Sequence, residues 1–158
     1  MKDKLEQETK PKAPITISGA IIMPYRYYAG STASRFFIEL RENRKIMGTR
    51  CLHCNCVYVP PRSTCFRCFN KIDEWVELNG RGTLQSYTVV HYSLPVHPLG
   101  SPFIYGVILL DGADTGLVHF VAEVESEELK IGMRLTPVFK DQREGNILDI
   151  KYFEPFHE

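Results

Sequence analysis

The chain has 158 residues, of which 44% are apolar, and it carries 19 basic and 19 acidic side chains. This composition supports one or two folded domains with a hydrophobic core and excludes an intrinsically disordered chain. No apolar run approaches the roughly 20 residues that span a bilayer, and the first residues lack the apolar core of a signal peptide. We therefore expect a soluble, cytoplasmic protein without a membrane partner.

The two signs of charge are unevenly distributed along the chain. Between Arg35 and Lys71 there are eight basic and two acidic residues, which is a net charge of +6. Between Ile72 and Glu158 there are six basic and fourteen acidic residues, which is a net charge of −8. An anionic ligand would therefore bind the first segment and be repelled by the second.

Residues 1–30 are expected to form a flexible tail followed by an extended arm. Up to residue 14, charges alternate with Thr, Gln and Pro without periodicity, which is typical of a mobile terminus. The following segment is rich in apolar and aromatic side chains, namely Ile15, Ile17, Ile21, Ile22, Tyr25, Tyr27 and Tyr28. Such an arm either lies across a partner or folds back on its own core, and the sequence favours neither.

An α-helix is expected within residues 31–48, with its regular part at 34–46. Apolar residues recur there near helical spacing, at Phe36, Phe37 and Leu40. The hydroxyl residues before this pattern are candidate N-caps, namely Ser31, Thr32 and Ser34. Gly48 is the expected helix stop.

Residues 49–79 are expected to form a zinc ribbon because they contain two Cys-x-x-Cys pairs. Cys51 and Cys54 form the first pair, Cys65 and Cys68 form the second, and ten residues separate the pairs. Four thiolates complete the tetrahedral sphere that Zn²⁺ prefers and leave no open position for a substrate, so the predicted zinc is structural. Iron accepts the same four sulfurs, and the spacing alone does not separate the two metals.

Two further potential ligands lie close to these cysteines in the sequence. His53 and Cys56 would fit a metal site sterically, but the regular spacing of the two pairs makes them bystanders. Cys56 as a reactive nucleophile would need a base beside it, and no pattern in the sequence assigns one.

Residues 80–158 are expected to form a small barrel. Alternation and β-branched or aromatic residues predict five strands, at 82–92, 103–111, 117–124, 134–140 and 146–153. The connections leave no room for repeated βαβ crossovers, so a partly open Greek-key barrel of the OB type is the simplest arrangement. The predicted fold is therefore mainly β, with an N-terminal helix, a zinc ribbon and a five-stranded OB-fold barrel.

Motifs of self-contained catalysis are absent from the sequence. There is no phosphate-binding glycine-rich loop, nucleophile elbow, paired His on a helix or nicotinamide fingerprint. His91, His97 and His119 fall in or beside predicted strands, where a hydrogen-bonded structural role is favoured. Asp111 and Asp114 are typical of turns. We therefore assign no catalytic residue to this chain.

The order of these features resembles the family catalogued as domain of unknown function 35. The resemblance covers roughly Tyr28 to Glu154 and is most specific in the four cysteines and the segments 46–51 and 58–62. It implies an N-terminal helix, a rubredoxin-like zinc ribbon and an OB-fold in a non-catalytic partner of enzymes that act on acyl-CoA, notably thiolases and related condensing enzymes. Within the family, this chain most resembles the zinc-finger subunits of thiolases, including the subunit of the thiolase that cleaves benzoylsuccinyl-CoA at the end of anaerobic toluene breakdown.

The resemblance and the charge distribution point to the same ligand. CoA carries a diphosphate and a 3′-phosphate, and the basic segment is where such a polyanion would bind. Arg50, Arg62 and Arg67, close to the cysteine pairs, are the candidate phosphate contacts. Equally supported is the alternative that these arginines neutralise the zinc thiolates and pair with an acidic surface of a partner.

Three aromatic residues of the ribbon allow two interpretations. The adenine of CoA could stack on Tyr58, Phe66 or Phe69. However, a zinc ribbon also needs aromatic side chains for its small core, and we favour the core position for all three.

Three functions are compatible with these features. The first is an accessory subunit of a thiolase-type enzyme, in a hetero-oligomer that shares CoA or acyl-CoA as a ligand. The second is a single-stranded nucleic-acid-binding protein, since zinc ribbons and OB-folds both occur in that role. The third, an autonomous acyl-CoA enzyme such as a thioesterase, lacks a catalytic constellation. The first is favoured, because an acidic barrel argues against nucleic acid.

Overall fold

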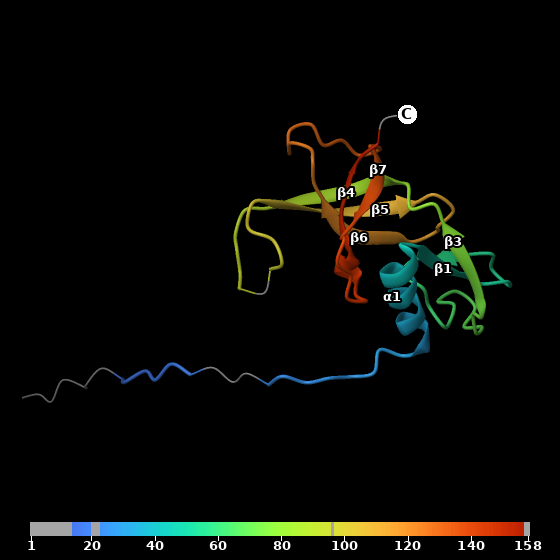
Figure 1. Ribbon diagram of the computed structural model, residues 1–158, viewed down its shortest axis with the longest axis horizontal. Coiled ribbons are helices and arrows are strands. Elements are labelled where there is room, and N and C mark those ends of the chain that lie inside the picture. Colours follow the sequence, from blue (N-terminus) through green and yellow to red (C-terminus); the bar gives the residue numbers. More distant parts are fainter. Residues whose placement is uncertain (1–13, 20–22, 96, 157–158) are drawn as a thin grey trace, which may run out of the picture.

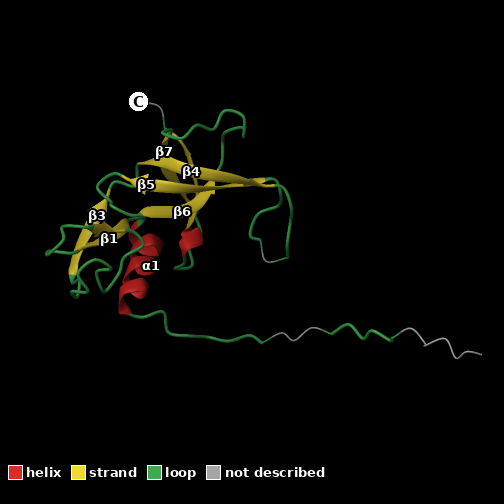
Figure 2. Cartoon of the chain, turned by 180° about the vertical axis from the view of Figure 1, so that it is seen from behind, coloured by secondary structure: helices red, strands yellow, loops and turns green. Residues whose placement is uncertain are grey.

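The structure, a computed structural model, describes residues 14–19, 23–95 and 97–156. In this part of the chain one α-helix leads into a three-stranded sheet and then into a five-stranded barrel (Figures 1 and 2). The fold is therefore mainly β with an N-terminal helix, as the sequence predicted. Of the tail expected up to residue 14, residues 1–13 lie outside the described residues, and so do Ile21 and Ile22 of the expected arm. Among the described residues, no helix is both long and apolar enough to cross a membrane.

Helix α1 spans Ser31–Asn43 and lies against both the small sheet and the barrel (Figure 1). It buries Phe36 and Leu40, two residues of the predicted apolar pattern. Gly30 is its N-cap, so the expected capping by a hydroxyl side chain is wrong, and no side chain caps the helix. The first turn also contains no acidic residue, which leaves its positive end without a neutralising carboxylate.

The end of α1 corrects the prediction of a helix up to residue 48. Arg44 has a left-handed conformation, with φ 54°, which ends the helix. Strand β1, Ile46–Arg50, follows at once. Gly48 lies in the middle of this strand, where a Cβ atom would be 3.0 Å from the carbonyl oxygen of Tyr58. The glycine therefore allows the close approach of a neighbouring strand and does not stop the helix.

The small sheet is antiparallel, with β1 at its centre. Strands β2, Val57–Tyr58, and β3, Glu74–Leu78, flank it in the order β2–β1–β3. All five residues of β1 pair with β3, from Ile46 opposite Leu78 to Arg50 opposite Glu74. Because Cys51 follows β1 directly, the sheet sets the position of the first cysteine pair.

The barrel contains the five predicted strands. They are β4 (Gly82–Val90), β5 (Phe103–Leu110), β6 (Gly116–Val121), β7 (Arg134–Phe139) and β8 (Ile150–Pro155). They close in the order β4–β5–β6–β8–β7, with only β6 and β8 parallel. The barrel is closed where a partly open one was expected. The last strand starts later than predicted, because Asn146 caps a short 3₁₀ helix at Ile147–Asp149.

One hydrophobic core joins the helix, the small sheet and the barrel. It contains Leu40 of α1, Ile46 of β1, Leu84 of β4 and Phe153 of β8, all essentially inaccessible to solvent. A second, smaller cluster surrounds the cysteines. Since the larger cluster is continuous, the zinc-ribbon sheet and the barrel are packed as one body.

Hydrogen bonds add a polar connection between the ribbon and the barrel. The carboxylate of Asp114, in the β5–β6 turn, accepts from the N–H of Val57 at 2.8 Å, and the N–H of Asp114 donates to the Val57 carbonyl at 2.9 Å. The hydroxyl of Thr115 accepts from the N–H of Val59 at 2.8 Å and donates to its carbonyl at 3.0 Å. Asp114 is therefore a tie between the two parts as well as a turn residue.

His119 is a buried structural histidine on β6. Its Nδ1 accepts from the N–H of Phe120 at 2.9 Å, and its Nε2 lies 3.1 Å from the carbonyl oxygen of Ile147. These partners suit a neutral ring with its proton on Nε2. Burial lowers the pKa of His119 below its ordinary value, the two hydrogen bonds oppose this, and the nearby charge of Lys140 adds to it.

We expect the free energy of unfolding to decrease as the pH falls below about 6.5. His119 has a lower pKa in the folded chain than in the unfolded chain, so the unfolded chain takes up the proton more readily. The component from this group has a slope of at most about 1.4 kcal/mol per pH unit. Denaturant unfolding between about pH 8 and pH 5 should show this component in the wild type and in the exposed-residue control H91Q, but not in H119Q. The assignment is wrong if H119Q retains the wild-type slope.

Candidate functional site

The four predicted metal ligands come together at one end of the small sheet. The Sγ atoms of Cys51, Cys54, Cys65 and Cys68 all lie within 4.8 Å of one another, and those of Cys51 and Cys68 are 3.6 Å apart. In a tetrahedral Zn²⁺ site with bonds of about 2.3 Å, neighbouring sulfurs are about 3.8 Å apart. All of these cysteines are free of disulfides. The donor set therefore fits a structural zinc ion, which would hold the two cysteine pairs together when bound.

The two cysteine turns, which we call knuckles and which comprise residues 51–56 and 65–70, share one backbone geometry. In each, the N–H of the first cysteine donates to the carbonyl five residues later, at 2.9 Å. The residue after the second cysteine, Asn55 or Phe69, has a positive φ of 54° or 58°. Two equivalent turns thus present their sulfurs to a common centre.

His53 and Cys56 lie outside this group of four sulfurs. Cys56 is buried in the small cluster of the ribbon, and its carbonyl accepts the hydrogen bond from Cys51. His53 Nδ1 is 3.8 Å from the Sγ of Cys54. Cys56 therefore has a packing position, and His53 lies beside one ligand.

Tyr58 makes a hydrogen bond to the metal site that the sequence did not reveal. Its side chain is fully buried, and its hydroxyl lies 3.1 Å from the Sγ of Cys65. Donation from this hydroxyl lowers the pKa of the Cys65 thiol to about 6 and raises the pKa of Tyr58. Tyr58 thus stabilises the thiolate that a metal requires and orients its sulfur. A Val-Tyr-Val segment indicates a strand but carries no signal for this contact.

We expect the substitution Tyr58→Phe to weaken zinc retention by about 10- to 100-fold, because it removes the hydrogen bond to Cys65 while keeping the packed ring. Competition with a chromogenic chelator measures this retention. Tyr92→Phe is the matched control, since Tyr92 is largely exposed and lies in the β4–β5 connection of the barrel. Equal zinc retention by Y58F and the wild type would show that the hydroxyl is dispensable.

The three predicted phosphate-binding arginines have different surroundings. Arg62 lines a hollow of about 470 Å³ between residues 29–33 at the start of α1 and residues 61–64. Arg50 lines another hollow, which also contains Asp114, and its Nη1 is 3.9 Å from a carboxylate oxygen of Glu74. The guanidinium of Arg67 lies 5.6 Å from the ring centre of Phe66 on the second knuckle. The structure therefore places Arg50 and Arg62 in separate hollows.

Arg62 has the most favourable environment of the three for an anion. Its backbone is held by the buried residue Thr49, whose hydroxyl accepts from the Arg62 N–H and donates to the Arg62 carbonyl, both at 2.9 Å. No acidic residue lines its hollow in the described part of the chain. Thr49 is a positioning residue that sequence reasoning missed, because only tertiary structure brings it next to Arg62.

The two knuckles expose large apolar side chains. Leu52 extends from the first knuckle, and Phe66 and Phe69, which are 54% and 80% exposed, extend from the second. The expectation that the ribbon aromatics form its core holds for Tyr58 and is wrong for Phe66 and Phe69. The cysteines, Tyr58 and Ile72 already fill the small interior, so these two rings remain outside.

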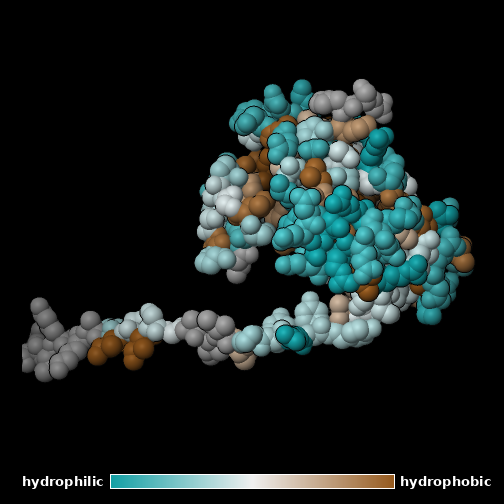
Figure 3. Space-filling view, in the orientation of Figure 1, coloured by the Kyte–Doolittle hydropathy of each residue, from teal (hydrophilic) through white to brown (hydrophobic). Residues whose placement is uncertain are grey.

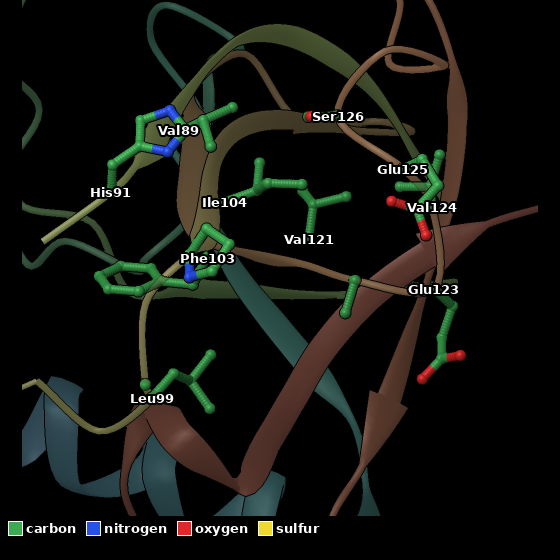
Figure 4. Close-up of a pocket in the computed structure, with 13 residues that line it drawn as sticks. Val89, His91, Leu99, Phe103, Ile104, Val121, Glu123, Val124, Glu125 and Ser126 are labelled. Atoms are coloured by element: carbon green, nitrogen blue, oxygen red, sulfur yellow. The ribbon is translucent and has the colours of Figure 1, made fainter. Parts of the chain in front are cut away.

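A different hollow of about 410 Å³ lies on the barrel at the base of the β4–β5 connection (Figure 4). Its walls are mainly apolar and include Val89, Leu99, Ile104 and Val121. The polar side chains that line it are His91, Glu123, Glu125 and Ser126. With two carboxylates and no Lys or Arg among its described residues, this hollow would repel the phosphates of a nucleotide.

Two family models match consecutive parts of the chain. Residues 39–74 match the ChsH2 rubredoxin-like zinc ribbon domain and residues 75–140 match the ChsH2 C-terminal OB-fold domain, together more than half of the chain. The solved structure named Ltp2-ChsH2(DUF35) aldolase has a TM-score of 0.61 and 25% identity, over 82% of this chain and 98% of that one. The chain belongs to the DUF35 family.

This DUF35 chain is similar to proteins described as scaffolds and as enzyme subunits. A DUF35 domain-containing scaffold protein of Methanocaldococcus jannaschii is 28% identical over 111 residues, 70% of this chain and 78% of that protein. A probable enoyl-CoA hydratase alpha subunit of Thermomonospora curvata is 30% identical over 122 residues, 76% of this chain but only 36% of that protein. A DUF35 structure from Sulfolobus solfataricus has a TM-score of 0.57 and 29% identity, over 69% of this chain and 78% of that one.

Proposed function

We propose that this DUF35 chain is a non-catalytic accessory subunit of a thiolase-type enzyme that acts on acyl-CoA. The observation that carries the proposal is the exposed apolar surface of the knuckles, formed by Leu52, Phe66 and Phe69. Exposed aromatic side chains beside arginines are typical of protein interfaces. A structural metal ion would hold this surface rigid and, with four thiolates around it, would have no open position for catalysis.

The relatives support a partner that is itself an enzyme. One is described as a scaffold protein, and a structural relative is described as part of an aldolase that also contains Ltp2. A third carries the name of an enoyl-CoA hydratase subunit. In the proposed hetero-oligomer the catalytic residues belong to the partner, and this chain contributes a docking surface and part of the CoA site.

The second part of the proposal assigns the phosphates of CoA to the basic side of the ribbon. Arg62 is the first candidate because its backbone is held by Thr49 and its hollow contains no carboxylate. Arg67 lies on the knuckle next to the exposed ring of Phe66, where an adenine would stack. Arg50, already close to Glu74, would contribute mainly through its charge. Charge-assisted hydrogen bonds from guanidinium groups suit a polyphosphate ligand.

We expect this chain and a thiolase-type condensing enzyme from the same organism to elute as one complex in size-exclusion chromatography, and the isolated chain to be inactive toward acyl-CoA. Cys51→Ser should abolish metal binding, ribbon folding and assembly together, because it breaks the four-sulfur set. His53→Ala, at an exposed residue outside that set, should assemble normally. Separate elution of the two wild-type proteins, or a fully active complex with C51S, would overturn the proposal.

The CoA contact has its own test. Arg62→Gln should raise the Kd of the complex for CoA by about 10- to 150-fold, since a charge-assisted hydrogen bond contributes on the order of 1.5–3 kcal/mol. The variant should also lower the dependence of CoA affinity on salt. Isothermal titration calorimetry measures both, with Lys151→Gln on the exposed face of β8 as the matched loss of charge. Unchanged affinity in R62Q would remove Arg62 from the site, and preferential binding of single-stranded oligonucleotides would favour the alternative function.

A further inference from the structure

The arm before α1 exposes a second apolar surface, separate from the knuckles. Residues 23–28 are neither helix nor strand, and Met23, Tyr25, Tyr27 and Tyr28 are all largely exposed. The arm leads from the start of α1 away from the folded body (Figure 1). The hydrophobic core contains no described residue of this arm, so the body is packed without it.

The side chains of this segment are sorted onto two sides. In an extended chain, successive side chains point to opposite sides, so positions two apart share one side. The rings of Tyr25 and Tyr27 lie on one side, with their centres 6.1 Å apart, as this alternation requires. Met23, Tyr25 and Tyr27 therefore form one face, which we call the odd face, and Tyr28 lies on the other. Ile15 and Ile17 form a similar exposed pair further along the arm, where hydrophobic side chains gather in Figure 3.

Two observations indicate what this face contacts. The arm meets α1 at Ala29 and Gly30, and both residues line the Arg62 hollow. The arm is thus continuous with the hollow assigned above to the phosphates of CoA, the ligand that this chain would share with the acyl-CoA enzyme. The family models start only at residue 39, so the arm lies outside the matched zinc ribbon and OB-fold. An element outside the shared scaffold is suited to recognising one particular partner.

We propose that residues 23–28 bind in extended form to an apolar groove of the thiolase-type catalytic subunit, with the odd face in the interface and Tyr28 toward solvent. The proposal rests on the function proposed above and specifies how the partner is selected. Tyrosine provides a large contact area at a low cost in side-chain entropy, and its hydroxyl finds hydrogen-bond partners at the rim of a groove. Pro24 restricts the free arm and reduces the entropy lost on binding.

The arm and the knuckles would then act as two linked contacts. Binding through one surface raises the effective concentration of the other, so the arm strengthens a complex that the ribbon already forms. Loss of the odd face should therefore weaken the complex without abolishing it. The zinc site and the barrel should be unaffected, because these tyrosines contribute nothing to the hydrophobic core.

A matched pair of substitutions tests the proposal. Tyr27 and Tyr28 are adjacent residues of the same type, 78% and 81% exposed, and the alternation of an extended chain assigns them to opposite sides of the arm. Surface plasmon resonance with the zinc-loaded full chain and the same condensing enzyme, immobilised, should show a Kd about 10- to 100-fold higher for Tyr27→Ser than for the wild type. Tyr28→Ser should change the Kd by less than about 3-fold, and Tyr25→Ser should resemble Tyr27→Ser.

The possible results separate this proposal from the proposed function. If Y27S and Y28S both bind with the Kd of the wild type, the arm makes no contact with the partner. The proposal then fails, while the accessory function stands. Equal weakening by both substitutions would overturn the assignment of the odd face. If Y27S instead disrupts a homodimer of this chain, measured by analytical ultracentrifugation, the arm binds a second copy and the proposal is wrong. Absence of any wild-type binding would overturn both proposals.

Discussion

The four cysteine sulfurs lie within 4.8 Å of one another, so their thiolates would repel strongly, and a divalent cation at their centre would convert this repulsion into a tight cross-link. The zinc ribbon of this chain depends on that cross-link, because only two short strands and β1 support the knuckles otherwise. Tyr58 belongs to the same constraint, since its buried hydroxyl donates to Cys65. Leu52 and Phe66 lie outside, because the cysteines, Tyr58 and Ile72 occupy the ribbon interior. The proposed docking surface is therefore only as rigid as the metal site beneath it.

Packing and hydrogen bonds hold the ribbon in a fixed position against the barrel. The core that contains Leu40 and Phe153 runs through both parts, and Asp114 ties the β5–β6 turn to Val57. Arg62 is fixed in turn by Thr49 at the centre of the same sheet. An anion in the Arg62 hollow would consequently meet a residue whose backbone is held by the whole body. Such rigidity suits an accessory subunit that completes a ligand site for a partner, because little ordering entropy remains to be lost on binding.

The DUF35 family accounts for the ribbon and the barrel of this chain but not for its arm. The family models cover residues 39–140, which contain the cysteines and four of the five barrel strands. The arm adds exposed Met and Tyr side chains that the folded body does not need. In the proposed assembly, the shared scaffold and the arm therefore have different roles. The scaffold presents metal-braced and basic surfaces, and the arm adds a contact through which one partner is distinguished from related enzymes.

The sequence by itself determined the features that depend on local spacing. Two residues between the cysteines of each pair define a knuckle, and alternation along the chain defines a strand, so the zinc ribbon and the five barrel strands were predictable. Tertiary structure decided what depends on contacts between distant residues. Gly48 lies within strand β1, at a point where β2 approaches closely. Phe66 and Phe69 are exposed because Tyr58 and the cysteines occupy the interior. The separate environments of Arg50 and Arg62 likewise follow from which elements fold against β1. A sequence pattern shows which residues are neighbours along the chain, whereas the tertiary structure decides which side chains occupy a small buried volume.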